Sequence, residues 1–266
     1  ITDWNGALLD QMRYHCETTR VEQLADRVRV STSGKVLPLA KFVGFVSEID
    51  YEIYSGGKVL VRWHGVPYGK MPECLPRIGM MFTLRKSYQS AVWYGRGVAE
   101  SYIDRCLSTP MGRYACSIEK MNTLYEVPQE TGNHYETRFV CVQEQNGPGF
   151  SVVGCPNFEF SFHPFDLQTL TRARHRSELT ESNVNYLYID YKMRGLGSYS
   201  CGPEPEEPYE LRPHEFNFAF LLLPESSETE ALAYARKAYD TQTAALSGTY
   251  TPQEQKKIRQ LFDCAE

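Results

Sequence analysis

The sequence predicts an all-β protein, a large antiparallel sandwich with a short N-terminal helix and a helical C-terminal tail. Three observations favour this fold class. Many segments alternate apolar and polar residues, which is the pattern of a half-buried strand. Short turns separate these segments, and helical periodicity is rare before residue 226. Aromatic residues, which are enriched in strands, make up 13% of the chain, with 18 Tyr and 13 Phe.

The first expected element is a helix over residues 4–14, WNGALLDQMRY, in which Leu8, Leu9 and Met12 share one face. Strand patterns then dominate, and Ser55-Gly56-Gly57 is expected to form a turn between two of them. The expected strands cover 27–31, 41–57, 58–66, 80–86, 135–144, 149–154, 158–162, 184–193 and 215–223. One or two helical turns are expected at 165–174.

The pattern changes to helical near Ser226. Residues 226–246 place Ala and Leu at helical spacing after Ser, Thr and Glu, which are typical of a helix start. A second helix start is expected at Thr251, followed by Pro252 at the first helical position. We therefore divide the chain into a β body over 1–223 and a helical extension over 224–266.

Composition excludes several functional classes. The net charge of −5 and the absence of a basic run argue against nucleic acid as a partner, and no apolar run is long enough to span a membrane. The eight cysteines are scattered without metal-ligand spacing, so we expect no metal and free, mostly buried thiols in a reducing compartment. A cytoplasmic location is therefore favoured. The first residue is Ile, so a processed subunit or an excised domain is expected.

The first candidate site is a glycine-rich turn after a strand. Trp93 and Tyr94 precede Gly95, Arg96 and Gly97, and the ion-pair-ready Asp104 and Arg105 follow. Glycine permits positive φ and a close approach of the backbone to another group, and Arg96 is expected to project from the turn. Two interpretations stay open from these residues alone: a structural corner held by an Asp104–Arg105 pair, which the pattern favours, or a mobile loop beside a ligand.

The second candidate site follows the strand that ends at Met193. A Gly-Leu-Gly segment opens a loop that contains Tyr199, Ser200 and Cys201 and closes at Gly202-Pro203. Cys201 has no neighbouring base in the sequence, so it is a poor candidate for a nucleophile. The five histidines after His15 are isolated and form no metal-binding motif, and no phosphate-binding or nucleophile-elbow motif occurs. No catalytic residue is therefore assigned.

These two loops carry a resemblance to a known family. WYGRGVAESYIDR (93–105) resembles the W-x-G-x-G-P-x-E-x-Y-x-D-R signature of the C-terminal domain of family 2 β-galactosidases, with Val98 in place of Pro. The chain is also similar to that domain in LPRIGMMFTL (75–84), YEVPQETGNHYETR (125–138), FEFSFHPFDLQTLTRARHRSEL (158–179) and YIDYKMRGLGSYSCGPE (188–204). The motifs follow in the order of the family over residues 1–223, whereas the helical tail departs from its pattern.

The resemblance implies a β supersandwich like that of galactose mutarotases. In the family, the catalytic glutamates and the magnesium and sodium sites lie on a (β/α)₈ barrel, which has no counterpart in this chain, so we expect no catalytic residue and no cofactor. The domain closes one side of the active-site cleft, so the resemblance implies that Trp93 to Gly97 and Tyr199 to Cys201 face galactoside sugars and that Asp104 and Arg105 anchor the first loop. The position of Cys201 is a Trp platform in well-known members, and Tyr199 offers a substitute.

Three hypotheses for function remain open. The chain is the C-terminal domain or small subunit of a β-galactosidase, inactive without a barrel-bearing partner or the rest of its polypeptide. Alternatively, it is a free-standing carbohydrate-binding module, as its many aromatic residues permit. An aldose mutarotase rests only on the shared architecture, which is a weak argument for function. Family members also assemble, so a homo-oligomer of the parent protein stays open.

Overall fold

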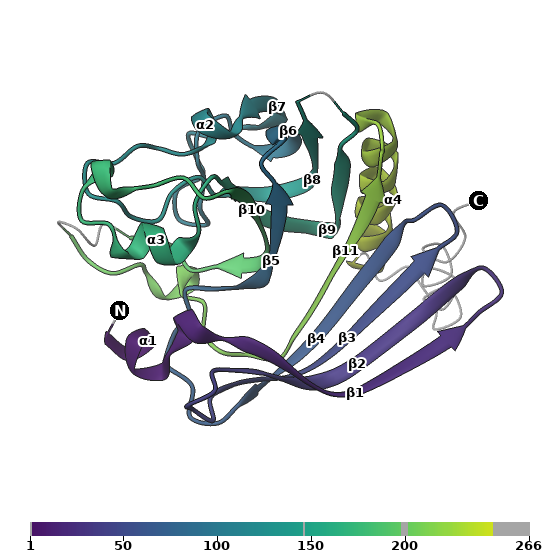
Figure 1. Ribbon diagram of the computed structural model, residues 1–266, viewed down its shortest axis with the longest axis horizontal. Helices are drawn as coiled ribbons and strands as arrows, with labels where there is room; N and C mark the ends of the chain where they lie inside the picture. Colours follow the sequence, from purple (N-terminus) through teal and green to yellow (C-terminus); the bar gives the residue numbers. More distant parts are fainter. Residues whose placement is uncertain (1, 146, 198–201, 247–266) are drawn as a thin grey trace.

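The computed structural model describes residues 2–145, 147–197 and 202–246 and confirms the all-β prediction (Figure 1). The strands are β1 (Arg13–Gln23), β2 (Arg27–Leu37), β3 (Gly44–Tyr54), β4 (Val59–Tyr68), β5 (Arg77–Arg85), β6 (Tyr88–Arg96), β7 (Met111–Ser117), β8 (His134–Glu144), β9 (Phe150–His163), β10 (Val184–Met193) and β11 (Phe216–Pro224). The α-helices are α1 (Thr2–Ala7), α2 (Ile118–Met121), α3 (Leu167–Arg172) and α4 (Glu228–Leu246), and short 3-10 helices cover Leu9–Gln11, Arg176–Glu178 and Glu207–Tyr209.

All strand pairs are antiparallel, and their order is β1-β2-β3-β4-β11-β9-β8-β6-β7, with β10 joining β9 to β5. The sheet divides at β9. The first half of β9, Phe150–Gly154, pairs with β11, whereas its second half, Glu159–His163, pairs with β10. Figure 1 shows β1 to β4 running side by side and reaching beyond the other strands. Strand β9 therefore links the strands next to β11 with the β10–β5 pair.

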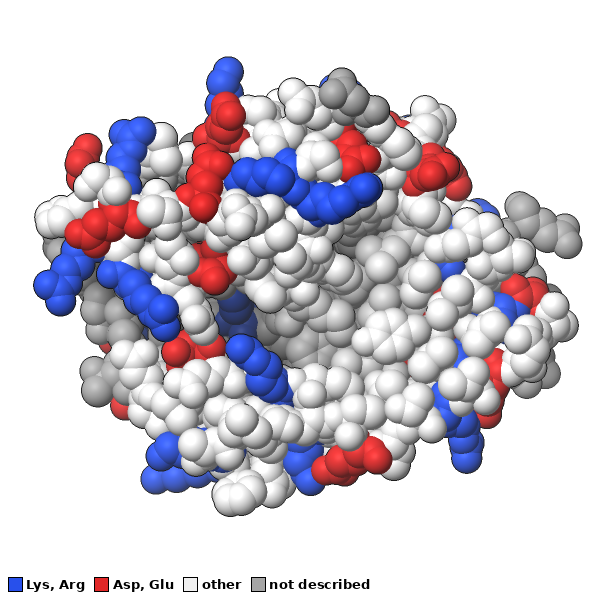
Figure 2. Space-filling view, viewed as in Figure 1, with Lys and Arg blue, Asp and Glu red and all other residues white. Residues whose placement is uncertain are grey.

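The larger apolar cluster among the described residues is rich in aromatic side chains. It contains residues of β3, β4, β5, β6, β8, β9, β10 and β11, so the main strand order and the β10–β5 pair both contribute to it. Trp63 of β4 packs edge to face on Phe216 of β11, with ring centroids 4.9 Å apart. Figure 2 shows that the face seen in Figure 1 is hollowed in its middle, where most side chains are uncharged. The body thus presents a concave face to solvent.

Helix α4 covers the outer side of the sheet. Its Ala231 and Ala235 are buried against Phe139 of β8 and Val153 of β9 in a second, smaller apolar cluster. Ser227 accepts a hydrogen bond from the backbone N–H of Glu230 through its Oγ atom at 3.2 Å, which satisfies one free donor of the first turn. The structure confirms the tail helix over 228–246, and the second helix predicted from Thr251 lies outside the described residues.

Three local predictions needed correction. The N-terminal helix is shorter than residues 4–14, because Leu8 adopts a left-handed conformation at φ 57° and β1 already begins at Arg13. Strands β1 and β7 were missed. Strand β1 is an edge strand that is exposed along most of its length, so its sequence shows no apolar face. The segments at 149–154 and 158–162 are one strand, β9.

Two further findings concern the thiols and the helices. The cysteines at 16, 74, 106, 116, 141 and 155 are unpaired, as predicted, but only Cys141 is buried and Cys16 is exposed. Within the part of the chain that the structure describes, no helix combines the length and the apolar character needed to cross a membrane.

Candidate functional site

Trp93 and Tyr94 lie on opposite faces of β6, which is paired on both sides by β7 and β8. The Trp93 side chain is fully buried, with its ring 4.3 Å from that of His134, and its Nε1 donates to the backbone oxygen of Arg96 at 3.0 Å. Tyr94 is 38% exposed and stacks on Phe139. The indole of Trp93 is thus covered by protein on a core face, and it is not available as a surface for a sugar.

Gly95 and Gly97 are required for close packing. Neither has a positive φ, but a Cβ atom on Gly95 would lie 2.8 Å from Oγ1 of Thr137. A Cβ atom on Gly97 would lie 2.7 Å from Cδ2 of Tyr114. Both distances are shorter than real Cβ contacts, so the expected close approach of the backbone is confirmed, and neither glycine uses the positive φ that it permits.

Arg96 does not project from the turn as predicted. Its Nε donates to Oε2 of Glu136 at 2.6 Å, and its Nη1 donates to the backbone oxygens of Cys106 and Thr109 at 3.1 and 3.2 Å. The guanidinium group therefore points into the protein and holds the 106–109 turn. A rigid fork of five donors suits this task, because several acceptors can be bound in one plane.

Arg105 pairs with Glu100 and not with Asp104. Its Nη2 lies 3.1 Å from Oε1 of Glu100, which also accepts a hydrogen bond from the Tyr125 hydroxyl at 2.6 Å. The other carboxylate oxygen of Glu100 accepts from Thr131 and from the Gly132 backbone. Burial disfavours the charged carboxylate, but these hydrogen bonds and the Arg105 charge outweigh it and lower the pKa of Glu100. Glu100 is thus an ionised centre that joins two loops.

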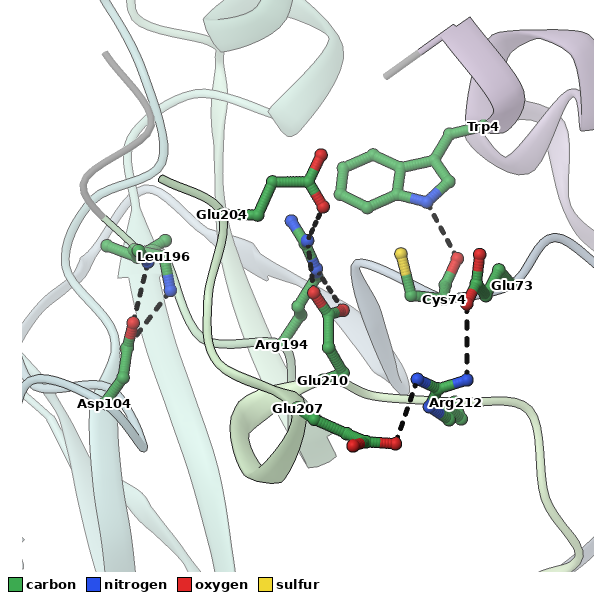
Figure 3. Close-up of polar contacts among 11 residues, drawn as sticks. Trp4, Glu73, Cys74, Asp104, Arg194, Leu196, Glu204, Glu207, Glu210 and Arg212 are labelled. Carbon is green, nitrogen blue, oxygen red and sulfur yellow. Dashed lines mark hydrogen bonds and ion pairs between the residues drawn. The ribbon is translucent and has the colours of Figure 1, made fainter. Parts of the chain in front are cut away.

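Asp104 brings together the two glycine-rich segments singled out in the sequence. Its Oδ1 accepts from the backbone N–H of Leu196 at 3.1 Å, and its Oδ2 accepts from that of Gly197 at 2.7 Å (Figure 3). A Cβ atom on Gly195 would lie 2.8 Å from Cγ of Asp104, so glycine is needed there for this approach. The anchoring role predicted for Asp104 therefore acts on the second loop.

The loop that follows Met193 has a rigid base. The Nε and Nη2 atoms of Arg194 donate to the two carboxylate oxygens of Glu210, each at 2.6 Å, and Nη2 also donates to Glu204 at 3.3 Å (Figure 3). The guanidinium lies 5.7 Å from the ring centroid of Trp4, whose Nε1 donates to the backbone oxygen of Cys74 at 2.8 Å. We name residues 194–212 the rim loop. Tyr199, Ser200 and Cys201 of this loop lie outside the described residues.

A buried carboxyl group links the base of the rim loop to the first loop. Oε1 of Glu159 accepts from the backbone N–H of Met193 at 3.0 Å, and Oε2 accepts from Nδ2 of Asn133 at 2.7 Å. Asn133 also donates to the backbone oxygen of Ser101 at 2.9 Å. Burial raises the pKa of Glu159 to about 8, against the lowering effect of these hydrogen bonds from Met193 and Asn133.

Sequence reasoning missed Trp4, Glu159, Arg194 and Glu210. None of them belongs to a short motif of known chemistry, and their partners are distant in the chain. His134 and His163, two of the histidines that belong to no metal-binding motif, are fully buried. Burial lowers the pKa of His134 to about 4 and that of His163 to about 3. Across residues 2–145, 147–197 and 202–246, no three His, Cys, Asp or Glu side chains gather in a way that could hold a metal ion.

Comparison with known proteins identifies the family. The family model described as β-galactosidase small chain matches residues 1–222, so the chain belongs to the β-galactosidase small-chain family. The match ends before α4. The chain is 30% identical to the β-galactosidase of Actinobacillus pleuropneumoniae over 83% of its own length and 21% of that protein. It is 29% identical to the β-galactosidase of Kluyveromyces lactis over 83% of this chain and 22% of that one.

The chain therefore spans about one fifth of the length of these relatives. Over a shorter stretch, 56% of the chain, it is 36% identical to the β-galactosidase of Staphylococcus xylosus, of which it covers 15%. Among solved structures it is similar to a galactose mutarotase related enzyme from Lactobacillus acidophilus. That likeness has 11% identity and a TM-score of 0.36, with 78% of this chain and 71% of the other covered. We draw no conclusion about function from it.

Proposed function

We propose that this chain is the small-chain part of a β-galactosidase, which hydrolyses terminal β-galactosides such as lactose, and that it completes the active-site cleft without cleaving the bond itself. One observation carries the proposal. The two segments that resemble the family's cleft-facing loops are far apart in sequence, yet Asp104 of the first binds the backbone of Leu196 and Gly197 in the second. Such an arrangement supports a single rim formed by both segments.

The described chemistry of the rim fits a structural and binding role. Hydrolysis with retention needs two carboxyl groups about 5 Å apart on either side of the glycosidic bond. The Asp104 carboxylate is occupied by two backbone N–H groups, and that of Glu210 is occupied by Arg194. The resemblance places the catalytic glutamates and the metal sites on the remainder of the protein. This chain would then supply Tyr199, Ser200 and Cys201 as contacts to the galactoside.

The test is reconstitution of activity from two separate chains. Hydrolysis of o-nitrophenyl-β-galactoside is measured with this chain alone, with the remainder of a relative that lacks its matched region, and with both expressed together. We expect turnover only when both are present. Turnover by the lone chain, or no gain on co-expression, would contradict the proposal.

The alternative of a free-standing carbohydrate-binding module has less support. Two of the three tryptophans are unavailable for stacking, since Trp63 is 6% exposed and Trp93 is fully buried. Calorimetry with galactose and lactose separates the two ideas, because millimolar or tighter binding by the lone chain favours the module. A mutarotase would need an accessible acid–base pair; polarimetry of fresh α-galactose that shows no acceleration removes that option.

A further inference from the structure

Two loop segments of the body, residues 98–109 and 122–133, are joined side by side. Glu100 of the first binds the hydroxyl of Tyr125 in the second at 2.6 Å, and Arg105 reaches both of these groups. The backbone N–H of Ser101 also donates to the oxygen of Asn133 at 2.7 Å. The two segments therefore form one surface that is supported from below by buried polar groups.

This surface carries four exposed apolar side chains, which we name the Glu100 patch: Val98, Leu107, Leu124 and Val127. Their exposed fractions are 61%, 101%, 50% and 65%, respectively. Val98 lies two residues before Glu100, Leu107 lies two residues after Arg105, and the other two flank Tyr125. Single exposed apolar residues are common on proteins, but a group of them on adjoining segments is typical of an interaction site.

Leu107 is the most exposed residue of this patch, and it lies in a turn that hydrogen bonds hold in place. It lies in the turn whose backbone oxygens, those of Cys106 and Thr109, accept from Nη1 of Arg96. The hydroxyl of Thr109 closes the same turn by donating to the oxygen of Cys106 at 2.9 Å. The backbone of such a turn is already ordered, so a partner that covers Leu107 has only its side chain left to order. Leu107 therefore offers a partner the most exposed apolar side chain of the patch on an ordered backbone.

We propose that the Glu100 patch is the surface on which this chain docks to the remainder of the β-galactosidase. The proposal rests on the proposed function. The relatives from Actinobacillus and Kluyveromyces carry most of their length outside the region that this chain matches, so a large partner of the same polypeptide adjoins the small-chain region. The patch also borders Asp104, which anchors the rim loop. Docking there would place the rim loop at the junction between the two parts.

The chain offers a matched control for this surface. Leu39 and Phe42 lie in the loop between β2 and β3, outside both segments, and they are 87% and 82% exposed. Leu39 and Leu107 are the same residue type with similar exposure, so their replacement by Asp changes charge and apolar area alike. Neither side chain is buried, so both variants are expected to keep the thermal stability of the unmodified lone chain.

The experiment co-expresses the full chain with the tagged remainder of the Actinobacillus relative and measures co-purification and galactosidase activity. We expect Leu107→Asp to lower the amount of co-purified chain and the activity at least tenfold, and Leu39→Asp to change them less than twofold. Equal effects of the two variants, or loss with Leu39→Asp alone, would overturn the docking surface while leaving the proposed function intact. If the unmodified chain fails to bind, both proposals fail.

A second copy of the chain is the competing occupant. Gel filtration of the lone chain distinguishes it. If the unmodified chain self-associates and Leu107→Asp abolishes this without affecting co-purification with the remainder, the patch joins copies of the chain and our proposal is wrong.

Discussion

Asp104 shows how one side chain can organise a site. Its carboxylate binds the backbone of Leu196 and Gly197, which follow it by 92 and 93 residues. Hydrogen bonds in which the acceptor is charged stabilise a fold more than neutral ones, by about 1.5–3 kcal/mol each. Two such bonds to consecutive N–H groups fix both the position and the direction of the chain at the start of the rim loop.

The substitution Asp104→Asn tests this role. Asn keeps the size of the side chain but presents an NH₂ group to one of the two N–H donors, so one bond is lost and the other becomes neutral. We expect amide hydrogen exchange at Leu196 and Gly197 to accelerate at least tenfold, which corresponds to about 1.4 kcal/mol. Asp26→Asn is the control, since Asp26 forms an exposed pair with Arg27. Unchanged exchange at both amides would contradict the anchoring role.

At the scale of the element, α4 illustrates how a helix of modest apolar character is attached to a sheet. Small residues, Ala231, Ala235 and Ala238, form its buried side and let the helix approach β8 and β9 closely. Arg138 of β8 adds a contact with the ring of Tyr239, 4.2 Å from its centroid. The helix therefore depends on close packing over a narrow stripe.

Two alanines on α4 provide a sharp comparison. Ala235 is buried at 4% exposure, whereas Ala233 is exposed on the same helix. Ala235→Asp would place a carboxylate in an apolar contact without a partner, so we expect a loss of about 3 kcal/mol or more in the free energy of unfolding. Ala233→Asp should cost less than about 0.7 kcal/mol, which reflects helix propensity alone. Urea denaturation measures both, and equal losses would show that α4 does not pack on the sheet in solution.

At the scale of the whole molecule, buried ionisable groups set the pH dependence of stability. Burial raises the pKa of Glu159 from an ordinary 4.5 to about 8, so between these values the folded chain keeps a proton that the unfolded chain releases. Stability must then fall as pH rises from about 4.5 to 8, by up to about 1.4 kcal/mol per unit. The buried His134 and His163 act in the opposite sense, since their lowered pKa values cost stability as pH falls below 6.5.

The substitution Glu159→Gln isolates the first effect. Gln stays neutral at every pH and occupies nearly the same volume, so the variant should gain stability relative to the unmodified chain as pH rises from 5 to 8. Gln turns its NH₂ group toward one of the two donors, Met193 N–H or Asn133 Nδ2, so the variant loses one hydrogen bond at every pH and is least stable relative to the unmodified chain near pH 5. Glu181→Gln is the control, because Glu181 lies at the surface and pairs with Lys86 rather than with a histidine. A parallel pH profile for Glu159→Gln and the unmodified chain would mean that Glu159 is ionised in the fold.

Parts of this structure could be predicted because the evidence for them is local. Alternation of apolar and polar residues located most of the strands, since a strand with one buried face must show it in its own sequence. The same reasoning failed for β1, which has no apolar face, and for Trp93, whose place beside two glycines resembled an exposed turn. Tyr199, Ser200 and Cys201 remain predicted contacts to the galactoside.

The amino-acid sequence alone determined the all-β class, the tail helix and the membership of a β-galactosidase family, because periodicity and ordered motifs are properties of the chain itself. Only the tertiary structure decided that Arg96 holds a turn, that Arg105 pairs with Glu100 and that Asp104 holds the rim loop. Strand pairing across the sheet brings Asp104 to partners 92 and 93 residues away, whereas Arg96 and Arg105 bind acceptors that lie close in the chain. Local pattern does not encode that pairing, because many partners of equal charge and size compete for each side chain until the core is assembled.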